Sequence, residues 1–183
     1  MDATFAYGRL DSPVGPVWVA TTGAGICALG LGAGQPDRLF AWLSRHIVPH
    51  PPREDPTALT PALTQLGGYF SRARRAFDLP LDMRGTGFQK AVWAELARIP
   101  YGATTSYGEI AHRLGRPRGA RAVGAAVGAN PLPILIPCHR VIGADGSLTG
   151  YGGGLDVKVA LLRLEGVLLG HDQRSDKQGR ERT

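Results

Sequence analysis

The sequence IPCHRV, residues 136–141, places a cysteine, a histidine and an arginine side by side. Cys138 is one of only two cysteines in the chain, and the apolar run PLPILI leads into it. The thiolate form of cysteine is the nucleophile, and a neighbouring base or positive charge favours that form. Most free cysteines are inert core residues, and we interpret Cys27 in this way. His139 and Arg140 make Cys138 the candidate nucleophile, although neighbours on a strand point to opposite faces.

A carboxylate, that of Glu165, falls on the apolar face of the last predicted helix. At about 100° per residue, Glu165 lies in the middle of the arc that contains Val157, Leu161, Leu162 and Leu164. An unpaired carboxylate is rarely fully buried. Either the helix end is exposed at this point, or Glu165 has a buried partner, for which His139 is suitable. In the second case Glu165 would orient the imidazole, and the imidazole would take the thiol proton of Cys138.

The composition is that of a folded chain with one large domain or two small ones. Of the 183 residues, 43% are hydrophobic, which is enough for a core. The first residues, MDATFAYGRLDSP, do not resemble a signal peptide, and no apolar stretch reaches the ~18 residues of a membrane span. Two cysteines make no disulfide framework, and no CxxC pair or histidine cluster indicates a metal. We therefore expect a cytoplasmic protein without a metal or a membrane segment.

The positive charge is concentrated in the second half of the chain. The net charge is +6, and residues 85–170 contain nine basic and five acidic residues. This surplus favours an anionic partner such as nucleic acid. A solvated basic surface without a partner is the alternative.

The patterns predict an α/β fold, with a small antiparallel sheet and helices in an N-terminal domain at 1–84. Residues 3–31 read as an antiparallel meander with turns at 12–16 and 23–25. Helices are expected at 37–46 and 61–70. The proline-rich segment 49–56 reads as a loop, and residues 77–81 are suited to rejoin the sheet.

Residues 85–170 are predicted to form a mostly helical C-terminal domain. Thr86-x-x-Gln89 and Ser106-x-x-Glu109 are capping boxes that start two helices. The second helix ends at Gly115, and a third spans 118–128, so that the pair reads as a helix-turn-helix. A glycine-rich loop follows at 145–154, and a last helix runs from 155 to 165. The tail, 171–183, is polar and expected to be disordered.

These motifs resemble the O6-alkylguanine-DNA alkyltransferase family. The resemblance rests on IPCHRV together with SYGEIA, ARAVGAAVGANP and GSLTGYGGGLDVKVALLRLEG. It is dense over residues 85–166 and looser over 1–84, where DSPVGPVWVA carries it. It implies a monomeric DNA repair protein that moves the alkyl group of O6-alkylguanine in double-stranded DNA irreversibly onto its own cysteine. O4-alkylthymine is a further candidate substrate. Each molecule would act once, without a cofactor, after flipping the damaged base from a duplex bound through its minor groove.

The resemblance also implies a role for each matched residue. Cys138 would be the acceptor, His139 the base through a water molecule, and Glu165 the group that polarises His139. Tyr107 would donate a proton to the leaving guanine, and Asn130 would hydrogen-bond the turn before the cysteine. Further DNA contacts are expected from Tyr107, Arg118, Ala120, Arg121 and Gly124, with Arg121 entering the duplex. The pocket wall is expected from Pro133, Val141, Tyr151, Gly152 and Gly153.

From the residues alone, other interpretations stay open. Arg121 could be a solvated helix arginine, Tyr107 a core aromatic residue and Asn130 an ordinary turn residue. An alkyltransferase-like protein, which binds damaged DNA without repairing it, would lack the acceptor cysteine. A Cys-His-Glu hydrolase would turn over many times and would not need a helix-turn-helix. A transcription regulator would not need Cys138.

Overall fold

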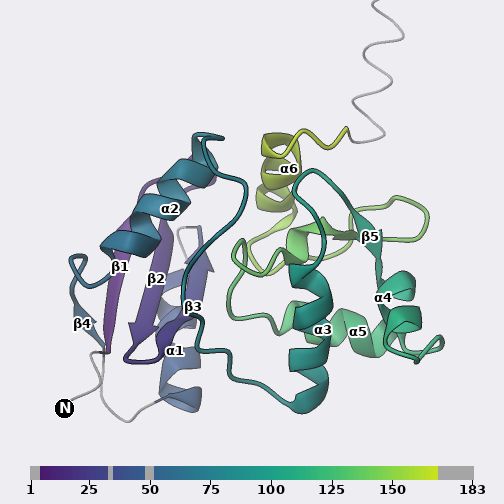
Figure 1. The fold of residues 1–183 in the computed structure, drawn as a ribbon, viewed down its shortest axis with the longest axis horizontal. Helices are drawn as coiled ribbons and strands as arrows, with labels where there is room; N and C mark the ends of the chain where they lie inside the picture. Colours follow the sequence, from purple (N-terminus) through teal and green to yellow (C-terminus); the bar gives the residue numbers. More distant parts are fainter. Residues whose placement is uncertain (1–4, 33–34, 48–51, 169–183) are drawn as a thin grey trace, which may run out of the picture.

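The computed structural model describes residues 5–32, 35–47 and 52–168, so the predicted disorder of 171–183 lies outside the described residues. Figure 1 shows a sheet with its helices beside a mainly helical part. Strands β1 (Ala6–Leu10), β2 (Val17–Thr22) and β3 (Gly25–Leu31) pair antiparallel in sequence order. This is the predicted meander. The sheet order is β3-β2-β1-β4.

The loop prediction for 49–56, of which residues 49–51 lie outside the described part of the chain, is wrong at two residues. Strand β4 (Arg53–Glu54) pairs in parallel with β1. The backbone amides of Arg53 and Asp55 donate to the carbonyls of Phe5 and Tyr7 at 3.1 and 2.9 Å. The flanking prolines lack amide hydrogens, but the residues between them keep theirs, and the edge of β1 accepts two of them. Residues 77–81 contribute a single bridge, from Leu81 to Ile26, and form no strand.

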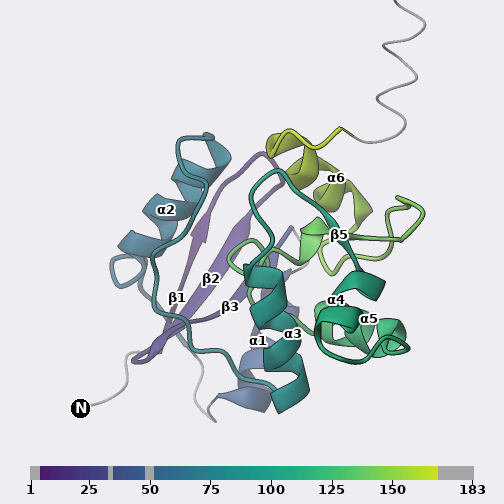
Figure 2. The same ribbon diagram turned by 45° about the vertical axis from the view of Figure 1, so that its right-hand side comes forward.

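The two faces of the sheet pack against different partners. Because side chains alternate along a strand, Val17 and Val19 face one side of β2 and Ala20 faces the other. Helix α1 (Gln35–His46) covers the second side, where Leu39 and Leu43 pack against Ala20 and β3. Helix α2 (Thr60–Phe70) and the C-terminal part cover the first side (Figure 2).

The C-terminal part contains the predicted helices. Helix α3 (Gly87–Ala97) and helix α4 (Tyr107–Arg113) each begin with the predicted capping box, at Thr86 and Ser106. Helix α5 (Ala120–Gly128) begins two residues later than predicted, because Gly119 is its N-cap. Helices α4 and α5 form the helix-turn-helix. The remaining elements are β5 (Thr105–Ser106), the 3₁₀ helix η1 (Cys138–Arg140), β6 (Val141–Ile142) and α6 (Leu155–Leu164).

One hydrophobic core joins the two parts. The same cluster of buried side chains contains Val19 and Leu66 from the first half and Leu96 and Leu161 from the second. The backbone amide of Leu29 in β3 donates to the carbonyl of Pro131 at 2.7 Å. The sheet therefore supports the segment that leads to Cys138.

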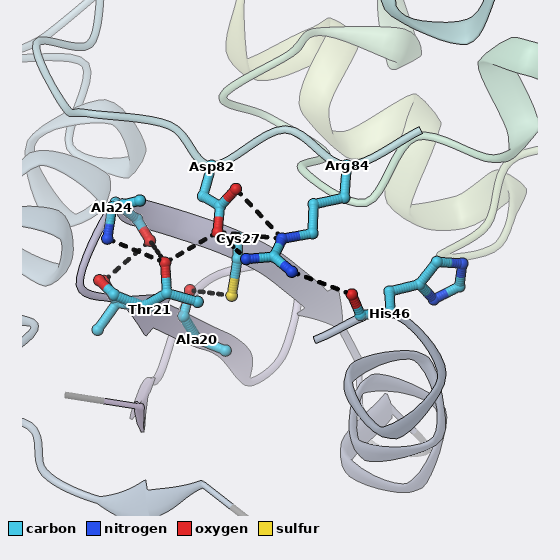
Figure 3. Close-up of polar contacts among 9 residues, drawn as sticks. Ala20, Thr21, Ala24, Cys27, His46, Asp82 and Arg84 are labelled. Atoms are coloured by element: carbon cyan, nitrogen blue, oxygen red, sulfur yellow. Dashed lines mark hydrogen bonds and ion pairs between the residues drawn. The ribbon is translucent and has the colours of Figure 1, made fainter. Parts of the chain in front are cut away.

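A polar cluster around Asp82 and Arg84 holds the segment that connects the N-terminal and C-terminal parts against the sheet (Figure 3). Asp82 accepts from Arg84 at 3.0 Å. It also accepts from the hydroxyl of Thr22 at 2.9 Å. Arg84 also donates to the backbone carbonyl of His46 at the end of α1. Burial raises the pKa of the nearby Cys27 thiol to about 12, so Cys27 stays a neutral thiol.

Within the described ranges, no helix combines the length and apolar character needed to cross a bilayer. Nor do these residues include three or more histidine, cysteine, aspartate or glutamate side chains grouped so as to hold a metal ion.

Candidate active site

A hydrogen-bonded turn connects the end of helix α5 to Cys138 and fixes the position of this cysteine. The side chain of Asn130 donates to the carbonyl of Ile136 at 2.8 Å and accepts from the amide of Leu132 at 3.0 Å. Inside this turn Ile134 has a φ of 73°, a left-handed conformation that is rare for a β-branched residue. Such strain costs about 1–3 kcal/mol and persists only when the surroundings enforce it. Asn130 is the side chain that braces this turn.

A cavity of about 280 Å³ reaches the Cys138 side chain. One wall comes from the end of α5, the turn that follows it and the glycine-rich loop. It includes the predicted residues Pro133, Tyr151, Gly152 and Gly153 together with Asn130 and Val127. The opposite wall comes from the N-terminal part, through Leu29 and Leu31 of β3 and Leu39 and Trp42 of α1. The cavity is large enough for an organic group beside the thiol.

His139 and Glu165 form a fully buried pair. The ring nitrogen Nε2 of His139 lies 2.7 Å from Oε1 of Glu165, and neither side chain is exposed. Because a carboxylate only accepts, Nε2 carries the hydrogen, and a neutral ring then has its lone pair on Nδ1. Nδ1 is buried and has no hydrogen-bond partner among the described residues. Nδ1 is therefore the atom of His139 that is free to take a proton.

Within the described part of the chain, five hydrogen bonds converge on the Glu165 carboxylate. Besides His139, Arg140 donates twice, at 2.8 and 2.9 Å, and the hydroxyl of Tyr69 donates at 2.7 Å. The fifth comes from the backbone amide of Gly102 at 3.1 Å. Burial alone would raise the pKa of Glu165, but the hydrogen bonds from His139, Arg140 and Tyr69 outweigh it and hold the pKa well below its usual range. Glu165 is therefore an anion at neutral pH.

The thiol of Cys138 is a neutral acid in the resting protein. Burial raises its pKa, and the Asn130 side chain, the positive charge of Lys158 and the Tyr151 hydroxyl only partly oppose this. Arg140 donates to the Glu165 carboxylate, and desolvation dominates at the thiol. The thiol must give up its proton during the reaction.

Lys158 is a buried cation close to this thiol. It has no exposed surface, and its ammonium donates to the carbonyls of Val141 and Thr149 at 2.6 and 3.1 Å. Burial lowers its pKa, whereas the charge of a Cys138 thiolate would raise it. Lys158 therefore ties β6 to the glycine-rich loop and supplies a positive field that stabilises the thiolate once it forms.

The residues expected to contact DNA lie on the helix-turn-helix. Arg118 and Arg121 are exposed, and Ala120 is half-buried. The ring of Tyr107 packs beside Gly124, and its hydroxyl lies 2.8 Å from that of Thr149. Tyr107 does not line the cavity that reaches Cys138. These residues lie on α4, on α5 and on the turn between them.

One expected pocket residue lies elsewhere, and two residues of the site were not predicted. Val141 does not line the cavity; its side chain is fully buried and its carbonyl accepts from Lys158. The sequence interpretation also missed Tyr69 and Lys158. Lys158 precedes Glu165 by seven residues, two helical turns, so its place on the same buried face was readable from the spacing. No comparable signal marked Tyr69, which lies 96 positions away from Glu165.

The fold and site define a protein with a buried cysteine beside a histidine–carboxylate pair, in the segment that follows a helix-turn-helix. The model of the 6-O-methylguanine DNA methyltransferase DNA-binding domain matches residues 87–167, and that of the ribonuclease-like domain matches residues 5–83. Curated relatives named methylated-DNA–protein-cysteine methyltransferase include proteins from Mycobacterium tuberculosis and Methanosarcina barkeri. They are 48% and 45% identical over 159 residues, which is 87% of this chain and 91% and 96% of theirs.

A solved structure agrees with these matches. The Mycobacterium tuberculosis protein OGT, crystallised in complex with DNA, superposes with a TM-score of 0.76 and 46% identity over 87% of this chain and 92% of its own. The chain belongs to the methylated-DNA–protein-cysteine methyltransferase family.

Proposed function

We propose that this protein repairs double-stranded DNA by transferring the alkyl group of O6-alkylguanine to Sγ of its own Cys138. The observation that carries the proposal is the buried arrangement of Cys138, His139 and Glu165 beside a cavity on a helix-turn-helix scaffold. The relatives' names and the solved complex with DNA support the choice of substrate. O4-alkylthymine is a second candidate lesion for the same site.

The reaction is a displacement at carbon. The thiol proton passes to Nδ1 of His139, through a water molecule, while Glu165 stabilises the imidazolium through Nε2. The sulfur attacks the alkyl carbon, a carbon–sulfur bond forms and the bond from that carbon to O6 of guanine breaks. The family resemblance assigns to Tyr107 the proton that neutralises the leaving guanine. Because Tyr107 lies outside the cavity around Cys138 and pairs with Thr149, the guanine must extend from that cavity to the helix-turn-helix to receive it. The thioether is stable, so each molecule acts once and needs no cofactor.

Flipping of the damaged nucleotide brings the alkyl group to the thiol. Inside a duplex the group is out of reach of a pocket, and extrusion of a base costs a few kcal/mol. The exposed Arg121 on α5 fills the gap in the stack, and the basic surface of the C-terminal part contacts phosphates. The small residues Ala120 and Gly124 let α5 approach the minor groove closely. The protein acts as a monomer.

The stoichiometry of the reaction tests this proposal against a hydrolase. With excess methylated duplex, methyl transfer should stop when one methyl group has been taken up per protein molecule. Continued loss of methyl groups from DNA after that point would refute the proposal and favour a Cys-His-Glu hydrolase.

Arg121→Ala separates base flipping from chemistry. Its Cys138 site stays intact, so a free alkylguanine base should react as fast as with the unaltered protein. The duplex substrate should react far more slowly, because the unstacking cost is no longer offset. Equal losses of rate on both substrates would contradict the proposed role. Weaker binding to every duplex, with the slope of log affinity against log salt concentration reduced by about one, would also contradict it, because that result indicates a phosphate contact.

A further inference from the structure

One of the five hydrogen bonds on Glu165 comes from the other half of the chain. Tyr69 lies in α2, packed against the N-terminal sheet, and its side chain has no exposed surface. Its hydroxyl donates to Oε1 of Glu165 at 2.7 Å, while the other four donors come from residues 102–140. The N-terminal part therefore reaches the polar centre of the active site directly.

Tyr69 and His139 share one oxygen atom. Oε1 of Glu165 accepts from the Tyr69 hydroxyl and from Nε2 of His139, both at 2.7 Å. A hydrogen bond to a charged acceptor is short and strong, and it withdraws negative charge from that acceptor. The Tyr69 hydroxyl thus limits how much negative charge His139 feels, and it fixes the direction in which Oε1 points.

Aromatic and cationic side chains hold Tyr69 in this position. Its ring makes an edge contact with Tyr101, at 6.1 Å between ring centres. The Tyr101 ring in turn contacts two guanidinium groups, that of Arg75 at 5.4 Å and that of Arg140 at 5.8 Å. The Tyr101 hydroxyl donates to the carbonyl of Leu164, next to Glu165. Residues of both halves thus fix the Tyr69–Glu165 contact.

We propose that Tyr69 is a positioning residue for the transfer reaction, which holds Glu165 in place and moderates its pull on His139. The proposal rests on the proposed function. It makes the N-terminal part a participant in the chemistry through a single hydroxyl group.

The test is Tyr69→Phe, which keeps the ring and its packing and removes only the donor. With one donor lost, more of the carboxylate charge acts on His139, so the pKa of that imidazole rises. The charged and titratable groups that face this pair are otherwise unchanged: Tyr101, Cys138, Arg140, Tyr151 and Lys158. The acid limb of the pH–rate profile for methyl transfer should move up by about half to one pH unit. Below that limb the rate should fall by about three- to tenfold, with unchanged affinity for DNA.

Tyr101→Phe is the matched control. It also removes a hydroxyl at the same junction, but that hydroxyl bonds a backbone carbonyl and not the carboxylate. It should lower the melting temperature and leave the acid limb in place. A purely structural Tyr69 would behave as Tyr101 does, so identical pH profiles for the two variants would overturn the proposal.

A second measurement does not depend on methyl transfer. The His139 ring, assigned by comparison with His139→Gln, can be titrated by NMR in the unaltered protein and in Tyr69→Phe. A higher pKa of His139 in Tyr69→Phe supports the proposal, and an equal or lower pKa overturns it. If the unaltered protein transfers no methyl group, the proposed function fails, and this titration still decides the role of Tyr69.

Discussion

At Glu165, one buried anion serves both stability and chemistry. Replacing it by glutamine keeps the shape of the side chain but removes the charge that faces Arg140 and His139. Loss of one partner of a buried ion pair costs about 3 kcal/mol or more. Glu165→Gln should therefore lower the free energy of unfolding by this order and slow methyl transfer by roughly tenfold to a hundredfold. Denaturant melts and single-turnover rates measure the two effects. Unchanged transfer in the folded variant would remove Glu165 from the mechanism.

The same residue predicts how stability depends on pH. Its pKa in the folded protein lies well below the usual value of 4.5. A carboxylate with a depressed pKa stabilises the folded state above its unfolded-state pKa, and this contribution disappears as the pH falls toward the folded-state pKa. The contribution of the Glu165 charge to the stability difference between the unaltered protein and Glu165→Gln should thus shrink as the pH falls below 4.5. A difference that grows on acidification would contradict this assignment.

At the scale of an element, the two glycines Gly119 and Gly124 of α5 and its N-cap differ in whether the structure has room for a larger side chain. A Cβ atom on Gly124 would meet only the Tyr107 ring, at 3.7–3.8 Å, whereas one on Gly119 would lie 2.9 Å from the carbonyl oxygen of Arg116. Alanine in a helix interior is favoured over glycine by about 0.5–1 kcal/mol. Gly124→Ala should raise the free energy of unfolding by that amount, and its matched control Gly119→Ala should lower it. The opposite order in urea melts would show that α5 is placed differently.

Local signals predicted the elements well and the site only in part. The capping boxes at Thr86 and Ser106 and the place of Glu165 on the apolar face of the last helix were readable, because helix starts and buried faces leave patterns within a few residues. Strand β4 was missed, because a two-residue strand depends on an edge that β1 provides far away in the sequence. Tyr69 was missed for the same reason: its function lies in a contact between halves of the chain.

For the whole molecule, the shared core predicts one cooperative unfolding transition. The same buried cluster contains side chains from the sheet, α2, α3 and α6, and Tyr69 and Leu29 hydrogen-bond across the junction. If one half unfolded, the buried side chains that the other half contributes to this cluster would lose their packing partners. Calorimetric and van't Hoff enthalpies should therefore agree, and tryptophan fluorescence should melt together with circular dichroism. Two separate transitions would show that the halves are independent domains.

The central claim, that Cys138 is the alkyl acceptor, is tested most directly by mass spectrometry of the protein after reaction with a duplex that contains O6-methylguanine. The account predicts one added methyl group per molecule, located on the peptide that contains Cys138. Cys27→Ala should give the same result, because Cys27 is a buried neutral thiol in the sheet. Cys138→Ala should gain no methyl group while it still binds the duplex. A methyl group on Cys27, or demethylated DNA with no change in protein mass, would contradict the account.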